Sequence, residues 1–204
     1  MRILPVLFNT GMVRAILDGR KTATRRAVKG FIPEDAVWGY TFFTPDNCIS
    51  CRGTFAGEYG EKFFKLPYHA GDTMYVRETW GDYRECKDGG CGYYLYRADY
   101  PDNAATYQCA GITCDLPLWH PSIHMPKEAA RIWLGVTEVR VERLQDIDDD
   151  GVVAEGLEVG SLFEELWDST IRKSDRDRCG WDANPWVWVV EFERCGKPEE
   201  GKKG

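Results

Sequence analysis

Strand-type segments dominate the sequence and limit the folds open to it. Three runs alternate β-branched or aromatic residues with polar ones: "TMYVRETW" at 73–80, "RIWLGVTEVRVERL" at 131–144 and "NPWVWVVEFER" at 184–194. This period of two is typical of half-buried strands. In the middle run the alternation slips between Val136 and Val139, which predicts a bulge. The eight tryptophans and ten tyrosines also favour a β-rich core.

Short helical patterns lie between these strands. The first is "FNTGMVRAILDG", which Asn9 or Thr10 would cap and which Gly19 would end in a left-handed turn. The segment "DIDDDGVVAEGL" is acidic at its start and ends in glycine, as short helices do. In "SLFEELWDSTIRKS", Ser161 and Glu164 have the spacing of a capping box. The order of elements predicts an α+β fold, a small mixed β-barrel with flanking helices.

Two stretches depart from these patterns. Residues 36–66 and 82–118 are rich in Gly, Tyr and Cys and have weak periodicity, so we interpret them as Cys-bearing insertions or long loops on one core. The prediction is a single domain over 1–195, followed by a flexible tail at 196–204.

Charge is spread unevenly along the chain. The net charge is −7, yet residues 1–29 carry a local charge of +6 and residues 142–182 a local charge of −8. This asymmetry indicates a cationic pocket on an acidic body and argues against tight, sequence-independent binding to long duplexes. Because no apolar run approaches ~18 residues, we expect a cytoplasmic protein with no membrane partner.

The segment "GRKTATRR" at 19–26 holds four basic residues and two threonines. One interpretation is structural: the cations complement a helix C-terminus, and the threonines are ordinary strand residues. The other is a ligand site in which neighbouring arginines and burial lower the pKa of Lys21 toward neutrality. The pattern alone leaves both open.

Several motifs, taken together, resemble the ASCH family of the PUA-like superfamily. They are "GRKTATRR", "PYHAGDTMYVRETW", "AEGL" and "WVWVVEF". The segments "PSIHMPKEAARIWLGVTEVRVERLQDI" and "WDANPWVWVVEFE" are further similar to ASCH proteins of phages and prophages. The resemblance covers most of the chain apart from the Cys-bearing insertions and the tail. It implies a PUA-like β-barrel with a cleft beside the first helix and the binding of RNA or modified bases.

One branch of the ASCH family hydrolyses N4-acetylcytidine to cytidine and acetate. Its G-x-K-T-x-T pattern matches Gly19, Lys21, Thr22 and Thr24, and its glutamate matches Glu155 of "VVAEGL". The resemblance implies that Lys21 acts as base, that Thr24 attacks the acyl carbonyl and that Glu155 orients Lys21 or the exocyclic amine. No cofactor would be needed for catalysis.

Further residues are candidates for substrate contact. Arginines could hold the developing oxyanion, and Glu78 is expected to form an ion pair with Arg25 or Arg26. Trp80 could stack a base or pack in the core, and His124 could contact substrate or order its own loop. The candidate substrate-binding residues are Arg20, Thr22, Arg25, Arg26, Arg77, Glu78, Trp80 and His124.

Cysteines in the predicted insertions have spacings that suit a structural zinc site. The preferred four ligands are Cys86, Cys91, Cys109 and Cys114, with Cys48 and Cys51 as the alternative pair. Free thiols in a reducing cytosol are the other interpretation.

Together these patterns predict a protein that binds a modified nucleoside or single-stranded RNA or DNA, and that could be an amidohydrolase acting on an N4-acylated cytidine. The alternatives are a non-catalytic RNA- or DNA-binding module, and a phage or host interaction protein with a zinc-stapled loop region. The sequence does not specify an oligomeric state.

Overall fold

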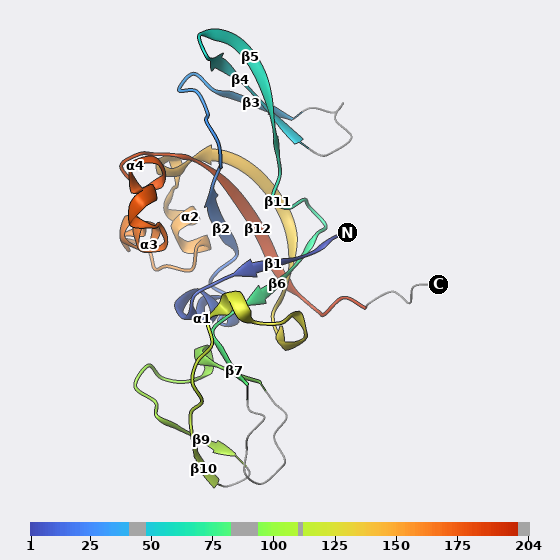
Figure 1. The fold of residues 1–204 in the computed structure, drawn as a ribbon, viewed down its shortest axis with the longest axis vertical. Coiled ribbons are helices and arrows are strands. Elements are labelled where there is room, and N and C mark those ends of the chain that lie inside the picture. Colours follow the sequence, from blue (N-terminus) through green and yellow to red (C-terminus); the bar gives the residue numbers. More distant parts are fainter. Residues whose placement is uncertain (41–47, 83–93, 110–111, 200–204) are drawn as a thin grey trace. The chain divides into compact units, whose positions relative to one another are not determined.

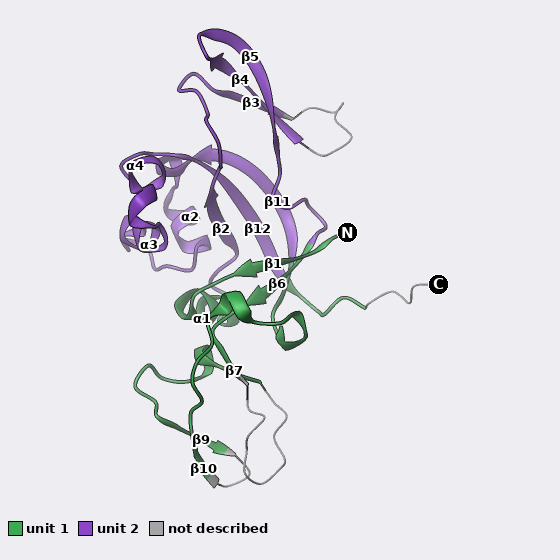
Figure 2. Ribbon diagram, viewed as in Figure 1, with its two compact units in different colours: residues 1–19, 73–134, 194–204 green, residues 20–72, 135–193 purple. Residues whose placement is uncertain are grey.

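The computed structural model describes residues 1–40, 48–82, 94–109 and 112–199. The chain divides into two compact units, shown in Figure 2. Unit 1 comprises residues 1–19, 73–134 and 194–204, and unit 2 comprises residues 20–72 and 135–193. The sequence patterns did not anticipate this grouping, because each unit is assembled from segments that lie far apart along the chain.

Unit 1 combines short strands with one helix, α1 (Thr10–Leu17). Parallel pairing joins β1 to β6, and antiparallel pairing joins β7 to β8 and β9 to β10. The strands are β1 (Ile3–Leu7), β6 (Thr73–Arg77), β7 (Trp80–Asp82), β8 (Tyr94–Tyr96), β9 (Thr106–Cys109) and β10 (Ile112–Asp115). The 3-10 turns are η1 (Arg97–Asp99), η2 (Ser122–His124) and η3 (Lys127–Ala129).

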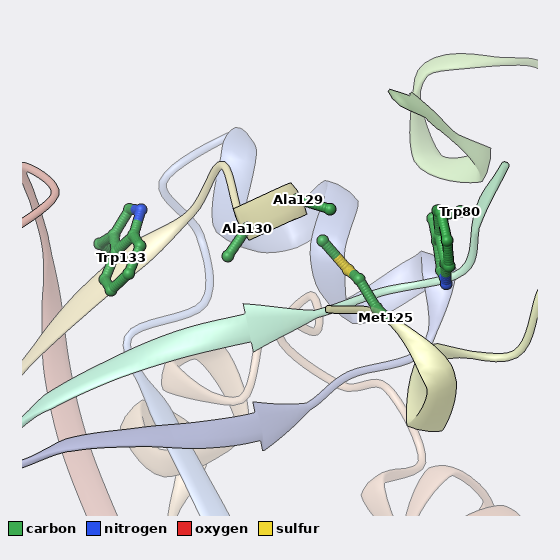
Figure 3. Packing of buried hydrophobic residues seen from close by; sticks show 5 residues of the cluster. All are labelled: Trp80, Met125, Ala129, Ala130 and Trp133. Atoms are coloured by element: carbon green, nitrogen blue, oxygen red, sulfur yellow. The ribbon is translucent and has the colours of Figure 1, made fainter. Parts of the chain in front are cut away.

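A buried cluster forms a core in unit 1. Figure 3 shows its residues, which come from β7, from the segment around η2 and η3, and from the start of β11. They are Trp80, Met125, Ala129, Ala130 and Trp133.

The caps of α1 confirm the sequence prediction. The Asn9 side chain accepts a hydrogen bond from the Met12 backbone N–H at 2.8 Å. Gly19 lies just past the helix at φ +76°, in the left-handed region that glycine adopts without a Cβ penalty. The chain can therefore turn sharply before it enters the basic segment.

Unit 2 contains a sheet in which most of β11, then β12 and then β2 are neighbours, and a separate sheet in the order β3-β4-β5. Its elements are β2 (Ala23–Ala27), β3 (Val37–Tyr40), β4 (Cys48–Phe55), β5 (Glu58–Lys65), β11 (Trp133–Arg143), η4 (Leu144–Asp146), α2 (Asp149–Ala154), α3 (Phe163–Thr170), η5 (Lys173–Asp175), α4 (Arg176–Cys179) and β12 (Trp186–Cys195).

Helices lie beside the sheet of unit 2, as Figure 1 shows for α2, α3 and α4 near β2 and β12. Phe163 and Trp167 of α3 pack against Val187 and Val189 of β12 and against Leu144. The predicted capping box is wrong: α3 begins at Phe163, and its N-cap residue is Leu162, with no side-chain cap hydrogen bond. Ser161 and Glu164 have the right spacing but lie one residue out of phase with the helix, since a capping box here would need residues 162 and 165.

The stretch at 36–66 contains β3, β4 and β5 rather than a long loop. Ala56 and Gly57 both have positive φ, which suits the tight turn between β4 and β5. Aromatic packing then anchors the sheet, since Trp38 contacts the rings of Phe64 and Trp186. The weak sequence periodicity hid these strands because many side chains on β5 are exposed.

The fold class α+β is confirmed at this coarse level, with many strands and few short helices. In the part of the chain that the structure describes, the strands form open sheets, and no closed barrel is found. Along β11, Val136 and Val139 are buried while Thr137 and Glu138 between them are exposed. This is the slip in alternation that the sequence indicates. The described helices include none long and apolar enough to cross a membrane.

Candidate functional site

The predicted basic segment and the predicted glutamate meet in unit 2. Lys21 forms an isolated antiparallel bridge with Glu155, and the Thr22 N–H donates to the Ala154 carbonyl at 2.8 Å. Glu155 is the C-cap residue of α2, and Gly156 follows it at φ +92°. A sharp turn after each helix therefore brings two segments that are distant in the chain side by side.

The Lys21 ammonium has three acceptors within hydrogen-bond distance. Its Nζ lies 2.5 Å from Glu155 Oε2, 2.7 Å from the Ala23 carbonyl and 3.0 Å from the Glu155 carbonyl. Lys21 is 2% exposed and Glu155 is 4% exposed. Because an ammonium carries three N–H donors, this arrangement matches its protonated form completely.

Glu155 uses its second carboxylate oxygen as well. Oε1 accepts the Arg25 backbone N–H at 2.7 Å and lies 3.4 Å from Arg25 Nη1. The carboxylate is therefore held between a lysine, a backbone amide and a guanidinium, which compensates for the cost of burying its charge.

These contacts also complete the free edge of β2, the last strand in its sheet. On the other edge, β2 and its flanking residues pair with β12: Thr22 O accepts from Phe192 N, and Val28 N donates to Trp186 O. The Ala23 carbonyl and the Arg25 N–H point away from β12 and bind Lys21 and Glu155 instead. The ion pair thus takes the place of a neighbouring strand.

Arg25 links this pair to a second carboxylate. Its Nε lies 2.9 Å and its Nη2 2.8 Å from Oε1 of Glu142. Glu142 and Glu191 both contact Arg140. A Cβ on Gly151 would lie 2.8 Å from Arg25 Nη2, so only glycine lets α2 approach the guanidinium this closely.

Burial dominates the protonation of the site. Desolvation lowers the pKa of Lys21 from its ordinary 10.5; Glu155 opposes this, and Arg26 and Arg25 add to the lowering. Burial also lowers the pKa of Arg26, against the attraction of Glu155 and Tyr68, and raises the pKa of Tyr68. Arg26 and Tyr68 therefore belong to the same electrostatic environment as the Lys21–Glu155 pair.

Thr24 lies on β2 between the residues that bind the pair. It is opposite Val190, and Arg26 is opposite Trp188, so Thr24 and Arg26 share one face of the sheet. Thr24 is 1% exposed, and no hydrogen bond to its side chain comes from the described residues. Two further predicted substrate-binding residues adjoin this segment. Thr22 is exposed. Arg20 Nη1 donates a hydrogen bond to the Gly156 carbonyl at 2.7 Å.

Comparisons of the chain with protein families, with curated proteins and with solved structures gave no match.

Four predicted substrate contacts belong to unit 1, whereas the Lys21 cluster belongs to unit 2. Arg77 donates to the carbonyls of Met125 and Ile123, which fixes the loop containing η2. Trp80 is 8% exposed and packs within the core cluster of Figure 3, so the structure supports its packing role. His124 is exposed on η2.

Glu78 is buried in unit 1, at 1% exposure, and its ion-pair partner differs from our expectation. Arg131 grips its two oxygens at 2.9 and 3.0 Å, in place of Arg25 or Arg26. Arg131 also bonds Asp99 at 2.7 Å and lies over the ring of Tyr96. The prediction that Glu78 needs an arginine holds; the partner is wrong because Arg131, although distant in sequence, lies in the same unit.

The preferred zinc ligands fall largely outside what the structure describes. This applies to Cys86, Cys91 and the side chain of Cys109. Cys48 and Cys51 lie three residues apart on the regular strand β4, so their side chains point to opposite faces. This pair does not offer two sulfurs to one metal ion. The described residues contain no cluster of three or more metal-ligating side chains.

Sequence reasoning missed Glu142, Tyr68 and Gly151 as neighbours of the site. Glu142 lies on the strand predicted at 131–144, and the strand pattern alone does not distinguish a solvent-facing carboxylate from an ion-pair partner. One signal was available in the sequence: Glu142 lies in a strand rich in arginine, and such strands favour ion pairs with neighbouring strands.

Proposed function

We propose that unit 2 is an ASCH-type, PUA-like nucleotide-binding module that hydrolyses the amide of an N4-acylated cytosine. The observation that carries the proposal is the buried contact of 2.5 Å between Lys21 and Glu155, with Thr24 on the adjoining strand. Lysine, threonine and glutamate at these positions are the residue types that the resemblance to the ASCH hydrolases implies.

The proposed reaction begins with Lys21 in its neutral form. The Thr24 oxygen bonds to the acyl carbon while its proton passes to the Lys21 amine, and the carbonyl electrons move onto oxygen. As the C–N4 bond breaks, Lys21 returns the proton to the departing cytosine amine. Water then cleaves the Thr24 ester, which releases the carboxylic acid and restores the hydroxyl.

The surrounding charges suit this sequence of steps. Burial and two arginines favour the neutral amine of Lys21, and Glu155 stabilises the ammonium that forms when Lys21 takes the proton. Arg26 shares the face of Thr24, so it is the arginine assigned to the oxyanion. Arg25 is committed to Glu142 and Glu155 and is assigned a positioning role.

A non-catalytic nucleic-acid-binding module is the second candidate. One observation favours it: all three protons of Lys21 are already engaged, two of them by carbonyls. In that case the pair serves only to seal the edge of β2. Binding to a nucleic-acid backbone would weaken steeply with salt, whereas hydrolysis of a small nucleoside would depend on salt only mildly.

The first test is a hydrolysis assay on N4-acetylcytidine and a panel of other acylated and alkylated cytidines, followed by ultraviolet absorbance. We expect turnover by the wild type. Thr24→Val, which keeps the volume and removes the nucleophile, and Lys21→Ala should each lower kcat by at least about 100-fold.

Thr137→Val is the matched control, because Thr137 is an exposed strand residue on β11. It should leave turnover unchanged. Full turnover by Thr24→Val would remove Thr24 as the nucleophile. Absence of turnover across the panel, together with salt-sensitive binding of oligonucleotides, would favour the non-catalytic module.

A further inference from the structure

A concave site lies in unit 2, at the end of β2 that is farther from Lys21 along the chain. A pocket of about 600 Å³ is bounded by residues 27–30, at and just after the end of β2, and by six residues from the end of α3 to the end of α4. These six are Thr170, Ile171, Arg172, Asp175, Arg178 and Cys179. This volume is within the range of small-molecule binding sites.

The charged groups of the pocket are mostly basic. Lys29, Arg172 and Arg178 line it, with Asp175 as the carboxylate among its lining residues. Asp175 lies 3.0 Å from Arg178. No ion pair in the described part of the chain engages Lys29 or Arg172, so these two cations are available to a ligand.

This basic character stands out against its surroundings. Residues 142–182 carry a local charge of −8, yet two of the five basic residues in that stretch, Arg172 and Arg178, line the pocket. Cations around a concave surface concentrate positive potential there and attract anions. Arginine forks in particular match the geometry of phosphate oxygens.

The pocket also has an apolar wall. Ala27, Val28 and Ile171 line it beside the cations. A ligand that satisfies both parts carries an anionic group next to an apolar surface, as a nucleotide does with its phosphate and its base or sugar.

We infer that this pocket binds a backbone phosphate of a single-stranded nucleic acid whose modified base occupies the Lys21–Thr24–Glu155 site. The identity of the base rests on the proposed function. The two sites lie along one extended segment: Thr24 and Ala27, a pocket residue, are both on β2, and three residues of a strand span about 10 Å. A ligand that reaches both sites therefore has to extend along the strand, which favours an oligonucleotide over a free nucleoside.

The test uses fluorescence anisotropy of a labelled, short single-stranded oligonucleotide, titrated with the full chain at several salt concentrations. The pocket variant is Lys29→Ala with Arg172→Ala. The control variant, Lys65→Ala with Lys173→Ala, removes the same charge from exposed residues that do not line the pocket.

We expect the pocket variant to bind at least about tenfold more weakly and to lower the slope of log K against log salt by about 1.4, the value for two lost phosphate contacts to a single strand. The control should change affinity by less than about threefold. Equal weakening by both variants would overturn the inference. Competition by a nucleoside monophosphate as strong as that by the oligonucleotide would overturn the strand-binding part.

Hydrolysis of free N4-acetylcytidine separates this inference from the proposed function. The pocket variant should retain wild-type turnover of the free nucleoside, because its substitutions lie outside the Lys21 site. If no acylated cytidine is turned over but the pocket variant still loses oligonucleotide binding selectively, the catalytic proposal fails and the phosphate pocket stands.

Discussion

Two opposing influences act on the protonation of the Lys21 side chain. It is buried, which favours the neutral amine, and it is surrounded by three acceptors, which favour the ammonium. Its protonation therefore depends on the balance between desolvation and Glu155. The proposed catalysis requires the neutral form, so any hydrolytic activity of the site should depend directly on that balance.

The pH dependence of hydrolysis follows from this balance. Burial lowers the pKa of Lys21 from 10.5, and a base is active only above its pKa. We expect kcat/KM for N4-acetylcytidine to rise with pH and to level off below pH 10.5. A pH series of initial rates measures this. A rate that falls as pH rises across the same window would contradict Lys21 as the base.

Removing the charge of Lys21 should also affect stability. Lys21→Met keeps most of the volume but leaves the Glu155 carboxylate buried without its closest cation, which typically costs about 3–5 kcal/mol. Urea unfolding measures this loss in the free energy of unfolding, and an unchanged m-value shows that the two chains unfold in the same way.

Adding Glu155→Gln to the Lys21→Met variant should recover part of the lost stability, with a coupling energy of about 0.5–3 kcal/mol between the two substitutions. Lys65→Met, an exposed lysine on β5, should change stability by less than about 0.5 kcal/mol. If Lys21→Met were as stable as the wild type, the ion pair would not hold the edge of β2.

At the scale of elements, the contact between α2 and β2 depends on the absence of a side chain at Gly151. An added Cβ would meet Arg25 Nη2 at 2.8 Å and Ile147 Cγ1 at 2.9 Å. The guanidinium of Arg25 cannot retreat without losing Glu142 or Glu155. The helix is therefore fixed against the strand by a close approach rather than by its own propensity.

Gly151→Ala should accordingly lower stability by about 1–3 kcal/mol, because overpacking exceeds any gain in helix propensity. Gly11→Ala is the matched control: Gly11 also lies in the first turn of a helix, α1, but the nearest atom to its Cβ would be 3.6 Å away. That substitution should raise stability by about 0.4–1 kcal/mol. Thermal unfolding distinguishes the two, and stabilisation by Gly151→Ala would show that α2 can move.

Elements and site were predictable from the sequence to different degrees. The caps of α1, the buried row of Met74, Val76 and Glu78, and the meeting of Lys21 with Glu155 follow from local patterns and from the family resemblance. The partner of Glu78 and the role of Glu142 do not. Both are side-chain contacts between segments distant in sequence, and no local periodicity encodes which arginine lies within reach.

The whole molecule is acidic, and this limits what it can bind. With a net charge of −7, its long-range field repels nucleic acid, so any binding of nucleic acid would have to come from local cation clusters such as the pocket that contains Lys29 and Arg172. Such a cluster would engage one or two phosphates, which is too few for tight binding to a long duplex.

A gel-shift comparison tests this at physiological salt. We expect no retention of a long duplex DNA at protein concentrations up to about 100 μM, which covers the dissociation constants of about 10⁻⁴–10⁻⁶ M of sequence-independent duplex binders. A reference protein with a basic surface provides the positive control. Micromolar duplex binding with a salt slope corresponding to six or more phosphates would contradict the picture of a localised cationic site.

The sealing of β2 by Lys21 and Glu155 has a consequence for how this chain could evolve. The two side chains satisfy the Ala23 carbonyl and the Arg25 amide. Selection for a stable fold alone would therefore preserve them in a descendant without catalytic activity. Thr24 donates no such bond within the described chain, so drift at that position, rather than at the lysine or the glutamate, would mark the lineages in which an enzyme had become a binding protein.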